Sequence, residues 1–262
     1  MLLRTLFFIC ALAYIPTAAA SPLTMNWWNG IPDNWKMVFK EKIKFSTPNP
    51  SAAQLNKIYA IKSLDCANKN LSTLAPLSAL KNLEVIWCDQ NAHISDLSPL
   101  TNLTKLKELD CSGTRISDLS PLTNLKELTK IIIYDTAVDD ISPLKNLKKL
   151  IGLDISGTRV TNISPLAGIH SLEALYFART KINDISSLNA LTNLGEITFS
   201  NSNVRDITIL KYMTQLREAV FAGTQVSQLG ALKNIQSLSI VYCTDTKVTA
   251  DEANTLQNSL PD

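Results

Sequence analysis

The sequence predicts an α/β solenoid, a curved array of about nine short coils whose parallel strands form the concave face, with a short helical cap at each end. Three observations lead to this prediction: apolar residues recur every 22 residues, each unit contains a Leu-x-Leu alternation, and most units carry a Ser-Pro-Leu tripeptide at a fixed offset. The 262 residues are 45% hydrophobic and 18% charged, which is enough apolar material for a continuous core.

The repeat is clearest from Leu106 onward. Its central inward-facing position recurs with spacings of 22 residues, and once of 23, at positions 66, 88, 111, 133, 155, 177, 199, 221 and 243. Alternation with period two is typical of a short strand that shows one face to a core. Proline in the Ser-Pro-Leu pieces fixes φ and bends the chain on the far side. One coil cannot bury its own leucines, so the coils must stack.

These motifs resemble the leucine-rich-repeat family over about residues 58 to 248. The 22-residue form with Asp-Ile-Ser-Pro-Leu is most similar to bacterial internalin-like repeats. The family often places asparagine where this chain has threonine, whose hydroxyl can still bond the turn backbone. These threonines are Thr114, Thr136, Thr158, Thr180, Thr224 and Thr246.

The first twenty residues predict a secretory signal peptide. Arg4 supplies a basic start, Leu6 to Ile15 is a short apolar run, Pro16 breaks it, and three alanines precede Ser21. We therefore expect a secreted or periplasmic protein with no lipid or transmembrane anchor. The predicted organisation is a signal peptide at 1–20, an N-terminal helical cap at 21–57, repeats at 58–248 and a C-terminal capping helix at 249–262.

The N-terminal cap is expected to begin with a helix capped by Asp33 or Asn34. This helix carries Trp35, Val38 and Phe39 on one side. Residues 43–45 are predicted to add an edge strand, and a second short helix follows Pro50. Residues 26–57 could alternatively form a separate binding module.

At the C-terminus, Thr249 and Glu252 predict a capping box. The helix that they open carries Ala253, Leu256 and Leu260, which can close the last coil.

Four cysteines remain after signal removal, and all of them fall in one inward-facing column. They are predicted to be small buried hydrophobic residues. A disulfide from Cys66 to Cys88 or from Cys88 to Cys111 stays open, because adjacent strands lie ~4.8 Å apart. Cys243 is expected to be free. No zinc site is expected, because paired Cys-x-x-Cys spacing and a histidine cluster are both missing.

No catalytic constellation is present, so we predict that the chain is not an enzyme and needs no cofactor or metal. The two histidines, His93 and His170, fall in turns or on the outer side. The sequence has no nucleophile elbow, His-Glu-x-x-His motif or phosphate loop. Aspartates recur at the turn before the Pro-Leu bend, where they are expected to bond backbone. These are Asp96, Asp118, Asp140, Asp184 and Asp206.

One residue of each strand, between its two inward positions, is expected to face the concave surface. This column reads Asp65, Trp87, Asp110, Ile132, Asp154, Tyr176, Thr198, Val220 and Tyr242. Large aromatic side chains with a polar surround are typical of a binding hot spot. They are also ordinary sheet formers, so a purely structural role stays open. The predicted partner-binding residues are Trp87, Asp89, Asp110, Ile132, Tyr134, Asp135, Asp154, Tyr176, Arg179 and Tyr242.

The sequence therefore predicts a monomeric, secreted binding protein that recognises a protein partner of some basic character through its concave face. The internalin-like resemblance implies a bacterial protein directed at a host surface, with a role in virulence. Two alternatives stay open, a carbohydrate-binding protein and a structural envelope protein with no dedicated ligand. The net charge of +2 gives no general attraction to nucleic acid or anionic membrane.

Overall fold

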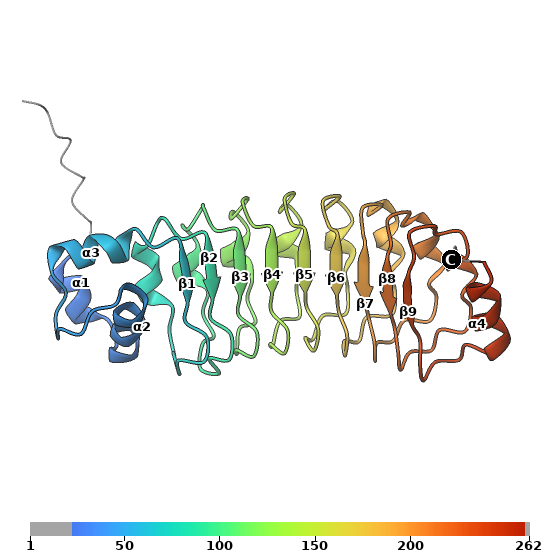
Figure 1. Cartoon of the computed structure of the whole chain (residues 1–262), viewed down its shortest axis with the longest axis horizontal. Coiled ribbons are helices and arrows are strands. Elements are labelled where there is room, and N and C mark those ends of the chain that lie inside the picture. The colour runs from blue at the N-terminus through green and yellow to red at the C-terminus, as the bar shows by residue number, and fades with distance from the viewer. Residues whose placement is uncertain (1–22, 260–262) are drawn as a thin grey trace, which may run out of the picture.

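The computed structural model describes residues 23–259 and confirms the predicted solenoid. One parallel sheet of nine strands runs the length of the molecule in sequence order, with helices at both ends (Figure 1). The predicted signal peptide and Leu260 lie outside the described residues. The strands are Ser63–Asp65 (β1), Val85–Trp87 (β2), Glu108–Asp110 (β3), Lys130–Ile132 (β4), Gly152–Asp154 (β5), Ala174–Tyr176 (β6), Glu196–Thr198 (β7), Glu218–Val220 (β8) and Ile240–Tyr242 (β9).

Neighbouring strands pair in phase, so residues of one column lie side by side along the sheet. Leu64 pairs with Ile86, which pairs with Leu109, and the same offset continues to Val241 on β9. Behind the sheet, each of the first eight coils turns through a short 3₁₀ segment. These are Ala75–Ala79, Ser98–Leu100, Ser120–Leu122, Ser142–Leu144, Ser164–Leu166, Ser186–Ala190, Thr208–Tyr212 and Gly230–Leu232.

The polar residues of each turn bond the backbone as predicted. Asp118 accepts hydrogen bonds from the backbone N–H of Ser120 at 2.7 Å and from its hydroxyl at 2.7 Å, and the pattern recurs at Asp96 and Asp140. The threonine column also behaves as expected, because Thr114 donates to the carbonyl of Cys111 at 2.6 Å. These bonds satisfy polar groups at every bend of the solenoid.

Asn91 stands in this turn column at the coil with the longer spacing, and it is fully buried. Its Oδ1 accepts from the backbone N–H groups of Lys69 and Leu71, and its Nδ2 donates to the carbonyls of Cys66 and Cys88. Asparagine thus joins two successive coils here, whereas threonine bonds only within its own coil.

A single core fills the array between the sheet and the 3₁₀ segments. In its central column, Phe199 lies between Phe177 and Phe221, with ring centroids 5.5 and 5.3 Å away and interplanar angles of 13° and 10°. Offset stacking of this kind adds to the stabilisation that comes from burial.

The N-terminal cap differs from the prediction in three ways. Its helices are Met25–Gly30 (α1), Asp33–Ile43 (α2) and Ala52–Tyr59 (α3). The helix that buries Trp35, Val38 and Phe39 and the helix after Pro50 were expected, whereas α1 was missed. Pro32, not Asp33 or Asn34, precedes α2, and it makes no side-chain cap. The predicted edge strand at 43–45 is wrong, because α2 continues through Ile43 and ends at Lys44 in a left-handed conformation.

At the other end, Ala250–Gln257 forms α4, and the predicted capping box is only half present. Thr249 accepts from the N–H of Glu252 at 3.2 Å, but the Glu252 carboxylate accepts from the N–H of Leu229 at 2.7 Å instead of reaching back to Thr249. Leu256 is buried, whereas Ala253 is exposed. No helix within residues 23–259 is long and apolar enough to cross a bilayer.

Candidate concave-face binding site

The first and third residues of every strand project from the solvent side of the sheet, while the middle residue enters the core. We call this side the concave face. It therefore carries two columns of strand residues, because residues two apart in a strand share a face. The predicted site used the third-residue column. The sequence-based prediction did not include the first-residue column. It consists of Ser63, Val85, Glu108, Lys130, Gly152, Ala174, Glu196, Glu218 and Ile240.

Trp87 lies between two carboxylates on this face. It pairs in register with Asp65 on β1 and with Asp110 on β3, and it is 40% exposed. Asp89 follows two residues later, and partial burial, then the nearby Asp110 charge, raise the pKa of its carboxyl. The structure thus brings together three of the predicted residues, Trp87, Asp89 and Asp110, at the N-terminal part of the sheet.

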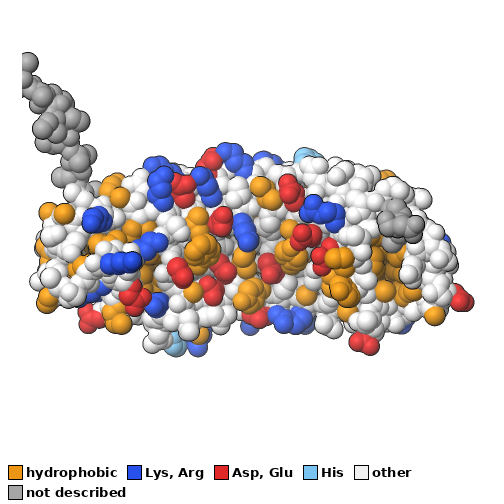
Figure 2. Space-filling model, viewed as in Figure 1, with side chains coloured by type: hydrophobic (Ala, Val, Ile, Leu, Met, Phe, Trp, Pro, Cys, Tyr) orange, Lys and Arg blue, Asp and Glu red, His pale blue; other side chains and the backbone are white. Residues whose placement is uncertain are grey.

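Ile132, Asp154 and Tyr176 form a second group, because they are register neighbours on β4, β5 and β6. All three are half-buried, and all three line a hollow of about 440 Å³ on the concave face. Figure 2 shows hydrophobic and acidic side chains interleaved along the middle of this face. The predicted mixture of apolar and acidic groups is therefore continuous in space.

The aspartates of the third-residue column also have a structural task. Oδ1 of Asp110 accepts from the backbone N–H and the hydroxyl of Ser112 at 2.9 and 2.7 Å. Oδ1 of Asp154 accepts from the N–H of Ser156 at 2.9 Å. Each carboxylate thus holds the turn that follows its strand.

Tyr134, Asp135 and Arg179 lie beyond the strands, in the turns at the edge of the concave face. Asp135 and Arg179 form an ion pair with an N–O distance of 2.7 Å that reaches over Gly157 of the coil between them. A Cβ on Gly157 would lie 2.0 Å from the Asp135 carboxylate, so glycine permits this crossing. Tyr242 on β9 is 58% exposed but lies three strands from Tyr176, so it is not part of the central group.

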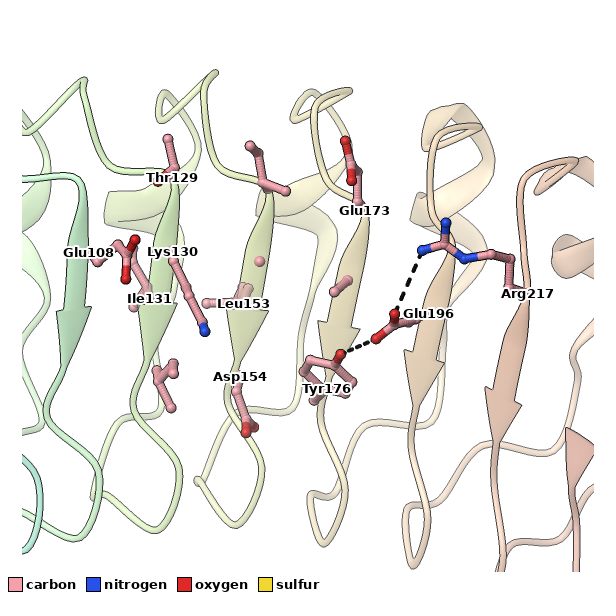
Figure 3. Close-up of a pocket in the computed structure, with 14 residues that line it drawn as sticks. Glu108, Thr129, Lys130, Ile131, Leu153, Asp154, Glu173, Tyr176, Glu196 and Arg217 are labelled. Atoms are coloured by element: carbon pink, nitrogen blue, oxygen red, sulfur yellow. Dashed lines mark hydrogen bonds and ion pairs between the residues drawn. The ribbon is translucent and has the colours of Figure 1, made fainter. Parts of the chain in front are cut away.

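Tyr176 is fixed by a chain of polar contacts. Its hydroxyl donates a short hydrogen bond to Glu196, and the other oxygen of Glu196 lies 3.7 Å from Arg217 (Figure 3). Partial burial, together with the adjacent Glu196 carboxylate, raises the pKa of the tyrosine hydroxyl. The phenol thus stays protonated and its ring is held against the sheet.

All four cysteines of the described chain are free, so neither disulfide that the sequence left open is formed. The thiols of Cys88 and Cys111 lie 2.9 Å apart, and their hydrogen bond and burial raise the pKa of Cys88. Cys66 is buried as well, whereas Cys243 is half-buried. Within residues 23–259, no three histidine, cysteine or acidic side chains are arranged to hold a metal ion.

The family model "Leucine Rich repeats (2 copies)" matches residues 60–102 and 104–146. No curated protein sequence matches the chain. Two similar solved structures are internalins from Listeria monocytogenes str. 4b F2365. Internalin C2 is 29% identical with a TM-score of 0.74, over 80% of this chain and 92% of that one. The internalin inlF is 24% identical with a TM-score of 0.71, over 85% of this chain and 72% of that one.

A third similar structure is the plant peptide hormone receptor RGFR1 in complex with RGF2. It is 17% identical with a TM-score of 0.63, over 80% of this chain and 40% of that one, and it shows the shared fold alone. The repeated family match, the in-register sheet and the likeness to two internalins agree with one another. The chain therefore has the leucine-rich-repeat fold, its architecture is similar to that of internalins, and such a fold supports a scaffold for protein–protein interaction.

Proposed function

We propose that this chain is an exported, monomeric and non-catalytic protein that binds another protein through its concave face. The observation that carries the proposal is the row of large side chains on the solvent side of the sheet. Trp87, Ile132 and Tyr176 all stand in the third-residue column, where solvent contact would favour small or polar groups. Aromatic anchors with a polar surround are the composition of interface hot spots.

The charge on this face indicates the kind of partner. The nine strands contain six carboxylates and one lysine, whereas the whole chain has a net charge of +2. Acidic groups therefore outnumber basic groups on the strands, and most basic groups lie elsewhere. Complementary charge steers association and suppresses wrong partners, so the proposed partner presents a basic surface.

Binding is tested by purifying the mature chain, capturing a partner from protein extract and measuring its affinity. Trp87→Ala combined with Tyr176→Ala is expected to weaken binding by at least about 30-fold, since hot-spot residues each contribute about 2 kcal/mol or more. Tyr212→Ala is the matched control, because Tyr212 is an exposed tyrosine on a 3₁₀ segment behind the sheet. Unchanged affinity of the double variant would refute binding through the concave face.

The same purified chain on a glycan array distinguishes the carbohydrate alternative. Saturable glycan binding that is lost in the double variant would replace the protein-binding proposal. Export is tested separately, by cell fractionation and N-terminal sequencing. The exported protein is expected to begin near Ser21, and an intact N-terminus in the cytoplasm would contradict the predicted signal peptide.

A further inference from the structure

The hollow on the concave face is created by two small residues in adjacent coils. Gly152 on β5 and Ala174 on β6 are register partners in the first-residue column. Their neighbours in the same column, Lys130 on β4 and Glu196 on β7, are long. The sheet surface is therefore low over two strands and high on both sides, which gives the space of about 440 Å³.

The floor of this hollow is apolar and its wall is charged. Ile132, Gly152 and Ala174 lie on the floor, and Figure 3 shows the side chains of Lys130, Asp154, Glu173 and Glu196 around it. Four carboxylates and two bases line the hollow in all, the remaining two charged groups being Glu108 on β3 and Arg217, which directly precedes β8 at the opposite end (Figure 3). The lining is therefore acidic.

Two carboxylates of the lining, Glu173 at the upper edge and Glu108 at the β3 end, are available to a ligand (Figure 3). Among the contacts of residues 23–259, the side chains of Glu108 and Glu173 have no hydrogen bond or ion pair. Glu196, by contrast, already accepts from Tyr176 and lies 3.7 Å from Arg217. Glu173 thus leaves an unpaired negative charge at the upper edge of the hollow, whereas Glu108 lies at the β3 end next to Lys130, its register neighbour.

We propose that this hollow receives a lysine or arginine side chain of the bound protein. Such a side chain has an aliphatic stem that packs on Ile132, Gly152 and Ala174, and a cationic head that reaches Glu173. A carboxylate in the same place would meet the like charge of Glu173, and a purely apolar group would cover that carboxylate without pairing it. The inference rests on the proposed function and specifies the partner's chemistry.

The hollow itself can be tested with small probes and amide NMR. N-acetylarginine methylamide is expected to shift the amide signals of Gly152 and Ala174 saturably. N-acetylnorleucine methylamide, which lacks the charge, is expected to bind more weakly, and N-acetylglutamate methylamide is expected to give no saturable shift. Equal or stronger binding of either of these two probes would overturn the proposal.

Two sets of variants connect the binding to this place. Gly152→Leu with Ala174→Leu fills the hollow without touching a carboxylate, and it is expected to abolish the saturable shift. The backbone accepts it, because a Cβ on Gly152 would lie 3.7 Å from the nearest atom, Cγ of Lys130. Gly230→Leu is the matched control, since no atom lies within 4 Å of a Cβ there. Arginine-probe binding that survives the filled hollow would overturn the proposal.

The charges are tested singly. Glu173→Gln is expected to weaken binding of the arginine probe roughly 2- to 5-fold, the range for an exposed ion pair. Lys130→Gln is expected to strengthen it, because it removes the opposing charge. Stronger binding of the arginine probe by Glu173→Gln, together with weaker binding by Lys130→Gln, would overturn the proposal.

The captured partner separates this inference from the proposed function. If Trp87→Ala with Tyr176→Ala abolishes partner binding while the filled hollow does not, the concave face binds the partner but the hollow proposal is wrong. If the arginine probe binds in the hollow but neither set of variants affects the partner, the concave-face proposal is wrong and the cation site remains.

Discussion

Replacing Phe199 by alanine tests whether the core column of stacked rings is close-packed. Phe199 is fully buried, and its ring is stacked on both faces, at 5.5 Å from Phe177 and 5.3 Å from Phe221. Phenylalanine-to-alanine changes in cores cost about 3–5 kcal/mol, the sum of lost transfer free energy and the cavity left behind. Each lost aromatic pair accounts for about 0.5–1.5 kcal/mol of interaction. We therefore expect a loss near the upper end, about 4–5 kcal/mol.

The cavity should not collapse, because strands in register hold both neighbouring rings. Phe199 directly follows β7, and Phe177 and Phe221 directly follow β6 and β8. Equilibrium urea unfolding of the mature chain, followed by circular dichroism, measures the free energy of unfolding. Thr198→Ala is the control, since Thr198 is the preceding residue but projects from the concave face, where changes usually stay within about 0.5 kcal/mol. A loss below about 2 kcal/mol for Phe199→Ala would refute close packing of this column.

Three further predictions concern charge, thiol access and a turn. Two lysine partners hold the pKa of Glu84 at about 2, below its ordinary value, so its contribution to stability is full above about pH 4.5 and is lost as pH falls towards 2. Melting temperatures of Glu84→Gln should accordingly fall less steeply with acid than those of the wild type, and parallel curves would contradict the ion pairs. Iodoacetamide should label Cys243 in the native protein and the three buried cysteines only after unfolding, as counted by mass spectrometry. Gly157→Ala should destabilise the protein by about 1–3 kcal/mol, because φ is +66° and the new Cβ would meet Asp135, and an unchanged melting temperature would show that this turn relaxes freely.

The repeats were predictable because the same apolar pattern recurs in every coil. Leu109, Ile131 and Leu153 occupy one core column, and their spacing alone placed the strands in register. The caps occur once each and offer no such repetition. Local hydrogen-bond choices decide their details, such as the continuation of α2 through Ile43 and the bond from Leu229 to the Glu252 carboxylate. Several arrangements of similar free energy compete at such positions, so short motifs alone did not select the right one.

The candidate site was partly predictable for the same reason. The third-residue column was found because Trp87 and Tyr176 stand out as large side chains between two inward positions. The two-residue period of a strand places the first-residue column on the same face. Its members include glycine, alanine and charged residues, which are typical of an ordinary solvated surface. Their significance depends on what stands 22 residues before and after, since those positions become lateral neighbours in the sheet.

Gly195 shows why two adjacent small residues are needed to make a hollow. It stands just before β7, where its neighbour in the next coil is Arg217, whose guanidinium would lie 3.0 Å from a Cβ on Gly195. A long side chain thus covers this single gap, and Gly195 is buried. Gly152 and Ala174 are consecutive in their column, so Lys130 can reach across only the first of them. A hollow on such a sheet is therefore predicted where two small side chains stand between two long ones in one column. The members of a column are found 22 residues apart in the sequence once the register is known.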